Sequence, residues 1–103
     1  MKPEVAEVRQ LKTGALSLEI EWNLRAALRG DREAQLYLGD AYTFGRGVEE
    51  DLEKAVEWYS KSANQGNAQA QDMMSFAYCI GLGVEKDEVE GRRWRVLAQS
   101  TRG

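Results

Sequence analysis

AQLYLGDAYTFGRGVEEDLEKAVEW, residues 34–58, decides the fold, because most of it recurs 36 residues later as AQDMMSFAYCIGLGVEKDEVEGRRW, residues 70–94. The identical positions are Ala34/Ala70, Gln35/Gln71, Ala41/Ala77, Tyr42/Tyr78, Gly45/Gly81, Gly47/Gly83, Val48/Val84, Glu49/Glu85, Asp51/Asp87 and Trp58/Trp94. A fixed period of roughly 20–50 residues is the sequence signature of a stacked-repeat architecture. The sequence therefore predicts a repeat protein.

Each copy is predicted to form two helices joined by a tight turn. The first half carries small or apolar residues at the spacing of one helix face: Ala34, Leu38, Ala41 and Tyr42. Gly45 then suits the left-handed residue that ends a helix, and Asp51 suits the N-cap of a second helix over residues 52–64. Two short helices cannot bury their apolar faces alone, so neighbouring hairpins must stack into a continuous core.

One set of positions in the first copy forms a specific pattern: Ala34, Leu38, Gly39, Tyr42, Gly45, Gly47, Val48, Asp51, Lys54, Ala55, Trp58, Tyr59, Lys61, Ala63 and Gly66. This pattern resembles the Sel-one-like repeat (SLR) family, a branch of the tetratricopeptide-like helical repeats. The second copy departs from it at Ser75, Gly91 and Arg95, as suits a terminal unit that packs on no successor. The resemblance implies an all-α fold, a right-handed α/α solenoid of helical hairpins, and binding of proteins or peptides without one fixed activity.

We expect a single helical-repeat domain over residues 1–103, divided into a degenerate first hairpin and two full repeats at 1–30, 31–66 and 67–102. The first hairpin is predicted from a short helix over 3–12 and a longer one over 15–29. Three tryptophans recur at one repeat position: Trp22, Trp58 and Trp94. We expect them in the core between repeats, with stacking on a ligand as the alternative.

Composition excludes several function classes. A net charge of −3 gives no general case for nucleic acid. No apolar stretch approaches about 18 residues, so neither a membrane span nor a leader is expected. The single cysteine, Cys79, allows no intramolecular disulfide and favours a cytoplasmic location. The chain has no histidine, which removes His-based catalysis and an ordinary catalytic zinc site. We expect no cofactor and no metal.

The remaining candidates for chemistry have structural explanations. Gly45 and Gly47 lack the spacing of a phosphate-binding loop and are interpreted as turn glycines. The acidic run that ends in Asp51 is interpreted as helix capping rather than a metal site. Cys79 is expected to be a buried or half-buried small side chain rather than a reactive thiol. An enzyme would require Asp40 or Asp72 to lie strongly perturbed in a closed cleft.

In tetratricopeptide-like solenoids, which this chain resembles, the first helix of each hairpin lines a concave binding face. The positions that this implies for partner binding are Glu33, Leu36, Asp40, Phe44, Asp72, Phe76 and Ile80, with Thr43, Gln69 and Cys79 beside them. The apolar members would be anchors, and Asp40 and Asp72 would pair with basic residues of the partner. The alternative is that the N-terminal helix fills this face and leaves only core.

Two function hypotheses follow from these patterns. The first is a non-enzymatic module that binds a protein or peptide partner as a small adaptor, regulatory subunit or inhibitor. The second is a homodimer formed through the last helix, where Trp94, Leu97 and Ala98 have no following repeat to cover them. Residues 31–66 are acidic and residues 88–103 are basic. These are interpreted as solvated faces, or alternatively as complementary patches that meet a partner or another copy.

Overall fold

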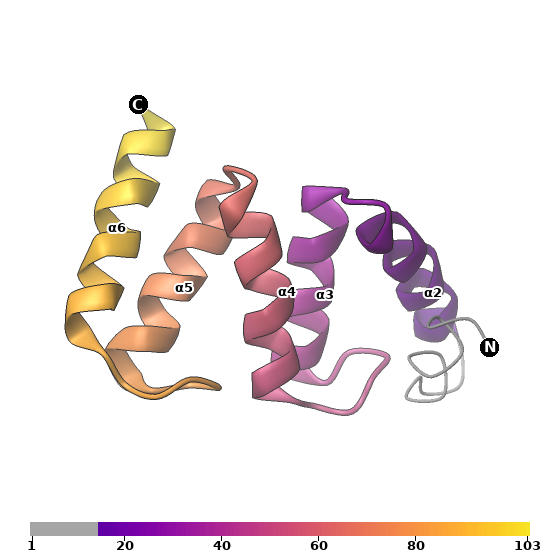
Figure 1. Cartoon of the computed structure of the whole chain (residues 1–103). Coiled ribbons are helices and arrows are strands. Elements are labelled where there is room, and N and C mark those ends of the chain that lie inside the picture. Colours follow the sequence, from indigo (N-terminus) through magenta and orange to yellow (C-terminus); the bar gives the residue numbers. More distant parts are fainter. Residues whose placement is uncertain (1–14) are drawn as a thin grey trace.

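The computed structural model describes residues 15–103, and their helices follow one another in a row (Figure 1). They are α2 (Ala15–Leu28), α3 (Arg32–Phe44), α4 (Leu52–Asn64), α5 (Ala68–Ile80) and α6 (Glu88–Arg102). Each helix packs on its neighbours in chain order, so the predicted all-α repeat architecture is confirmed. The helix expected over 3–12 lies outside the described residues, and the division of the chain into three units stays a prediction.

The two hairpins turn at the same local signals. Helices α3 and α5 end at Gly45 and Gly81, whose φ angles of 66° and 74° lie in the left-handed region that favours glycine. Asp51 and Asp87 each accept a hydrogen bond from the backbone N–H three residues further on, at 3.1 and 3.0 Å. The helix ends and caps expected from the sequence are therefore confirmed.

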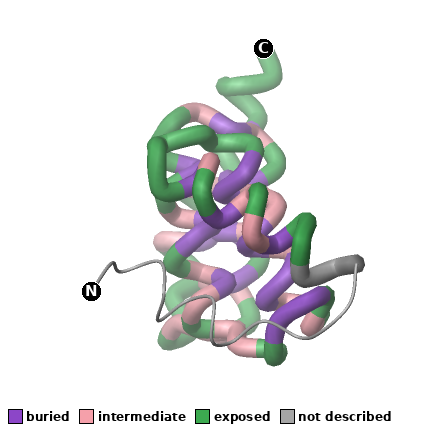
Figure 2. Tube along the Cα trace, turned by 90° about the vertical axis from the view of Figure 1, so that its right-hand side faces the viewer, coloured by how far each residue is buried: buried purple, intermediate pink, exposed green. Residues whose placement is uncertain are grey.

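A pair of buried glutamines joins the repeats. Nε2 of Gln35 on α3 donates to the carbonyl oxygen of Ala27 at the end of α2, at 3.1 Å. Gln71 on α5 makes the same bond to Ala63 at the end of α4, also at 3.1 Å. Both glutamines are buried. Buried segments recur along the stacked helices, while the C-terminal end is exposed (Figure 2). Since a buried amide needs a partner, this bond explains why glutamine recurs at this repeat position.

The three tryptophans do not share one environment. Trp58 on α4 is buried, and Trp94 on α6 is half-buried and packs against the core. Trp22 on α2 is 74% exposed, so its expected place in the core is wrong. Helix α2 packs against α3 with the face that holds Ile20 and Leu24, and at about 100° per residue Trp22 lies on the opposite face.

One close helix approach is built differently in the two hairpins. A Cβ atom on Gly39 of α3 would lie 2.5 Å from the ring of Tyr59 on α4, so a larger residue does not fit. The second hairpin has Ser75 at the equivalent place, and there the glycine is Gly91 on α6. A Cβ on Gly91 would lie 2.5 Å from Sγ of Cys79. In the first hairpin the glycine at the close approach is on the first helix, α3. In the second hairpin it is on the second helix, α6.

We expect Gly39→Ala to destabilise the protein by about 1–3 kcal/mol, because the added methyl group overlaps the Tyr59 ring. Alanine favours a helix over glycine by up to about 1 kcal/mol. A lower free energy of unfolding in the variant would therefore be due to the overlap with the Tyr59 ring. The measurement is urea unfolding followed by circular dichroism. Ser75→Ala, at the matched position of α5, serves as control and should change the free energy of unfolding by less than about 1 kcal/mol. Equal stability of Gly39→Ala and the parent would contradict the packing described.

Candidate functional site

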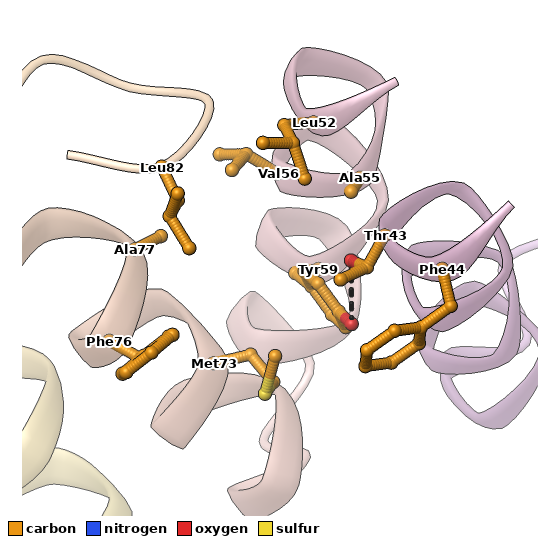
Figure 3. Close-up of a pocket in the computed structure, with 10 residues that line it drawn as sticks. All are labelled: Thr43, Phe44, Leu52, Ala55, Val56, Tyr59, Met73, Phe76, Ala77 and Leu82. Carbon is orange, nitrogen blue, oxygen red and sulfur yellow. Dashed lines mark hydrogen bonds between the residues drawn. The ribbon is translucent and has the colours of Figure 1, made fainter. Parts of the chain in front are cut away.

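An apolar pocket of about 210 Å³ lies between α3, α4 and α5 (Figure 3). Phe44 forms one side, while Met73 and Phe76 from α5 form the opposite side. The full lining is Thr43, Phe44, Leu52, Ala55, Val56, Tyr59, Met73, Phe76, Ala77 and Leu82. Pockets for whole small ligands usually exceed about 300 Å³, so this pocket has the size for one side chain rather than for a cofactor.

The two phenylalanine rings of the apolar pocket are also its most exposed members. Phe44 is 59% exposed and Phe76 is 52% exposed, although both are large apolar side chains. The guanidinium of Arg46 lies over the Phe44 ring at 5.2 Å from its centre. Two exposed rings that face one hollow form the kind of surface that a partner covers.

A second hollow, of about 260 Å³, adjoins the first and shares Met73 with it. We call it the acidic hollow; its lining is Leu36, Asp40, Gln69, Asp72, Met73 and Arg102. Asp72 on α5 forms an ion pair with Arg102 from the last turn of α6, and both side chains are about half exposed. The charged lining is therefore open to solvent.

A hydrogen-bonded group connects the two hollows. The hydroxyl of Tyr59, on the floor of the apolar pocket, donates to Oδ1 of Asp40 at 2.5 Å. Thr43 Oγ1 lies 3.1 Å from the same hydroxyl (Figure 3) and donates to the carbonyl oxygen of Gly39 at 2.8 Å. Burial, and then the bond to Asp40, raise the pKa of the Tyr59 hydroxyl well above its usual range. The tyrosine thus stays protonated and holds the Asp40 carboxylate in place.

The structure brings five of the seven predicted partner-binding residues together and leaves two apart. Phe44 and Phe76 line the apolar pocket, and three line the acidic hollow: Leu36, Asp40 and Asp72. Ile80 is exposed on α5 but lines neither hollow. Glu33 accepts a hydrogen bond from Nδ2 of Asn67 at 3.0 Å, so it links α3 to the N-cap of α5.

Sequence reasoning missed several residues of the apolar pocket: Leu52, Val56, Tyr59, Met73 and Leu82. Comparing the two copies of the repeat could have identified some of these pocket residues. In the preceding unit, 36 residues earlier, the places of Tyr59, Met73, Phe76 and Leu82 hold Asn23, Tyr37, Asp40 and Arg46. There the Tyr37 hydroxyl donates to Glu19 at 3.1 Å. The repeat fold is thus compatible with polar residues at these places, and the apolar lining is additional to it.

The outer face of α6 is a second unusual surface. Val89, Val96 and Leu97 are exposed there beside Arg92 and Arg93. The expectation that Trp94, Leu97 and Ala98 form an uncovered surface is therefore corrected: Ala98 is fully buried and Trp94 is half-buried. On α4, the residues that line the pocket next to α5 are Leu52, Val56 and Tyr59. The equivalent positions on α6, 36 residues later, are Glu88, Arg92 and Arg95. The end of the row is therefore polar where a further hairpin would stack.

Three further features concern Cys79, metal binding and a membrane span. Cys79 is half-buried, and Arg95 Nη2 lies 4.0 Å from its sulfur. Within residues 15–103, no group of three His, Cys, Asp or Glu side chains is placed to hold a metal ion. None of the helices in this part of the chain is long and apolar enough to cross a membrane.

Comparison with known proteins places the chain in a family. The family model described as Sel1 repeat matches residues 32–67 and 68–94. The crystal structure of a Sel1 repeat protein from Oxalobacter formigenes is similar, with a TM-score of 0.80 and 33% identity over 82% of this chain. A protective antigen present in uropathogenic Escherichia coli strains, which displays an SLR fold, has a TM-score of 0.79 and 37% identity over the same share.

The chain spans 34% of the first of these proteins and 18% of the second. No curated protein matches the sequence. The two repeat matches cover more than half of the chain, and the solved structures share its arrangement of helices. The protein therefore belongs to the Sel1 repeat family, whose members are generally protein–protein interaction modules.

Proposed function

We propose that this protein is a non-enzymatic interaction module that binds a protein or peptide partner in the groove along α3 and α5. In this role it would act as a small adaptor, regulatory subunit or inhibitor. The observation that carries the proposal is the apolar pocket between Phe44 and Phe76, whose lining is polar in the preceding unit at several equivalent places. A partner that inserts one bulky side chain there would cover both exposed rings.

The remaining features of the groove favour binding over catalysis. Asp40 and Asp72 lie in an open hollow, where the first accepts a bond from Tyr59 and the second pairs with Arg102. Neither carboxylate therefore lies in the closed cleft that acid–base catalysis would require. The acidic character of the groove supports a protein or peptide ligand over nucleic acid. The cytoplasmic location stays a prediction, and it rests on the single cysteine.

A second candidate function is self-association through the outer face of α6. It is favoured by Val89, Val96 and Leu97, which are exposed at places where α4 carries Glu53, Ser60 and Lys61. Against it, a two-fold pairing of α6 with its copy would bring Arg92 and Arg93 of both chains to the same interface. We therefore rank it below binding in the groove.

Peptides selected from a randomised phage-displayed library on the immobilised protein should depend on the two phenylalanines. We expect Phe44→Ala combined with Phe76→Ala to weaken their binding by at least about tenfold, because anchors in a small pocket dominate affinity. Ile80→Ala is the matched control, since Ile80 is equally exposed on α5 but lines neither hollow. Binding that survives the double change, or that Ile80→Ala weakens equally, would place the partner elsewhere.

The self-association candidate is tested by light scattering behind size exclusion over a concentration series. If α6 pairs, the mass should rise from 11.6 kDa toward that of a dimer, and Val96→Glu should keep it at the monomer value. Ser60→Glu, at the matched place on α4, should leave the concentration dependence unchanged. A parent protein that stays monomeric at every concentration removes this candidate.

A further inference from the structure

The groove has two chemical layers that the repeat does not produce. Asp40 precedes Phe44 by four residues on α3, and Asp72 precedes Phe76 by four residues on α5. Both aspartates line the acidic hollow, and both phenylalanines line the apolar pocket. The two pairs lie 32 residues apart in sequence rather than the repeat length of 36. Each layer therefore combines residues that do not occupy equivalent positions of the repeat but line the same hollow.

From these layers we infer that the groove selects a partner segment with a bulky apolar side chain and a basic side chain about 6 Å apart on one face. The inference rests on the proposed function and specifies the partner's chemistry. Four residues of a helix rise about 6 Å, which sets the distance between the acidic and the aromatic layer. Residues i and i+2 of an extended segment lie about 6.6 Å apart on the same side, so an extended segment meets this spacing.

The preference for a basic side chain depends on the negative charge of Asp40. Its carboxylate accepts a hydrogen bond from Tyr59, which is a neutral donor. Among the ion pairs formed within residues 15–103, none includes Asp40. The side chain is only partly buried, so its negative charge remains available to a cation in the hollow. A partner carboxylate at the same place would be repelled.

Arg102 shows that the acidic hollow accommodates a guanidinium group. It reaches from the last turn of α6 to Asp72 and forms part of the lining itself. The pair is half exposed, and such pairs contribute little to stability. Arg102 is therefore a replaceable occupant: a partner's basic side chain can bind beside it at Asp40 or displace it from Asp72.

Arg46 gives the groove a direction. It follows Phe44 in the chain, on the side away from Asp40, and its guanidinium lies over the Phe44 ring. A positive charge thus lies at the Phe44 ring, whereas the aspartates that line the acidic hollow are Asp40 and Asp72. A basic side chain is attracted to the aspartate end and repelled at the arginine end. The partner's basic residue is therefore assigned to the acidic hollow and its apolar residue to the apolar pocket.

The test uses three synthetic peptides, acetyl-Ala-Phe-Ala-Arg-Ala-amide and its versions with Glu for Arg or Ala for Phe. Binding is measured from backbone amide shifts in two-dimensional NMR spectra of the full chain. We expect the Phe/Arg peptide to shift residues around Phe44 and Phe76 and to bind about three- to fivefold more tightly than the Glu version. The version without Phe should lose most of the binding.

Two variants assign the preference to the acidic hollow. Asp40→Asn keeps an oxygen for the Tyr59 hydroxyl but removes the charge, so the preference for Arg over Glu should fall below about twofold. Arg102→Gln removes the resident cation and should strengthen binding of the Phe/Arg peptide about twofold. Glu57→Gln, an exposed change on α4 outside both hollows, is the control and should leave the preference unchanged.

The outcomes separate this inference from the function on which it rests. If Phe peptides bind at the two rings with equal affinity for the Arg and Glu versions, the basic preference is overturned and binding in the groove stands. A preference for the Glu version overturns the inference in the same way. If no peptide shifts the pocket residues, the inference is overturned, and the library selection on the Phe44 and Phe76 variants decides the proposed function independently.

Discussion

The groove depends on the buried glutamine bond between repeats. Gln35 and Gln71 each fasten the first helix of a hairpin to the last turn of the helix before it, at the same 3.1 Å. The Gln71 bond ties α5 to the last turn of α4, and α4 packs against α3 as well. A buried N–H without its acceptor would cost about 1–3 kcal/mol, which favours keeping this bond. The apolar pocket thus has walls set by the scaffold.

Local signals allowed much of the fold to be predicted from the sequence. The ends of α3 and α4 follow from Gly45, Asp51 and Gly66, since capping and left-handed turns depend on a few adjacent residues. The position of Trp22 could not be predicted in the same way. Its burial depends on which face α2 turns toward α3, and that face holds Ile20 and Leu24 rather than the residue that repeat counting assigns to the core.

The candidate site was predicted in part, for a related reason. Positions of the first helices gave Asp40, Phe44, Asp72 and Phe76, because exposed residues there are not needed for packing. Their arrangement in two layers was not visible, since aligning the copies at 36 residues sets Asp40 against Phe76. Which residues of α3 and α5 share a hollow depends on how the two helices pack against α4 between them. Only the three-dimensional structure supplies that arrangement.

Scaffold and site are coupled most closely at Tyr59. Its ring requires Gly39 for the close approach of α3 and α4, and it forms part of the pocket lining. Its hydroxyl then holds Asp40, so one side chain supports both chemical layers. In the second hairpin Arg95 stands at this place, and the glycine has moved to Gly91. That hairpin keeps its packing without a tyrosine, which indicates that Tyr59 serves the groove between α3 and α5 as well as the fold.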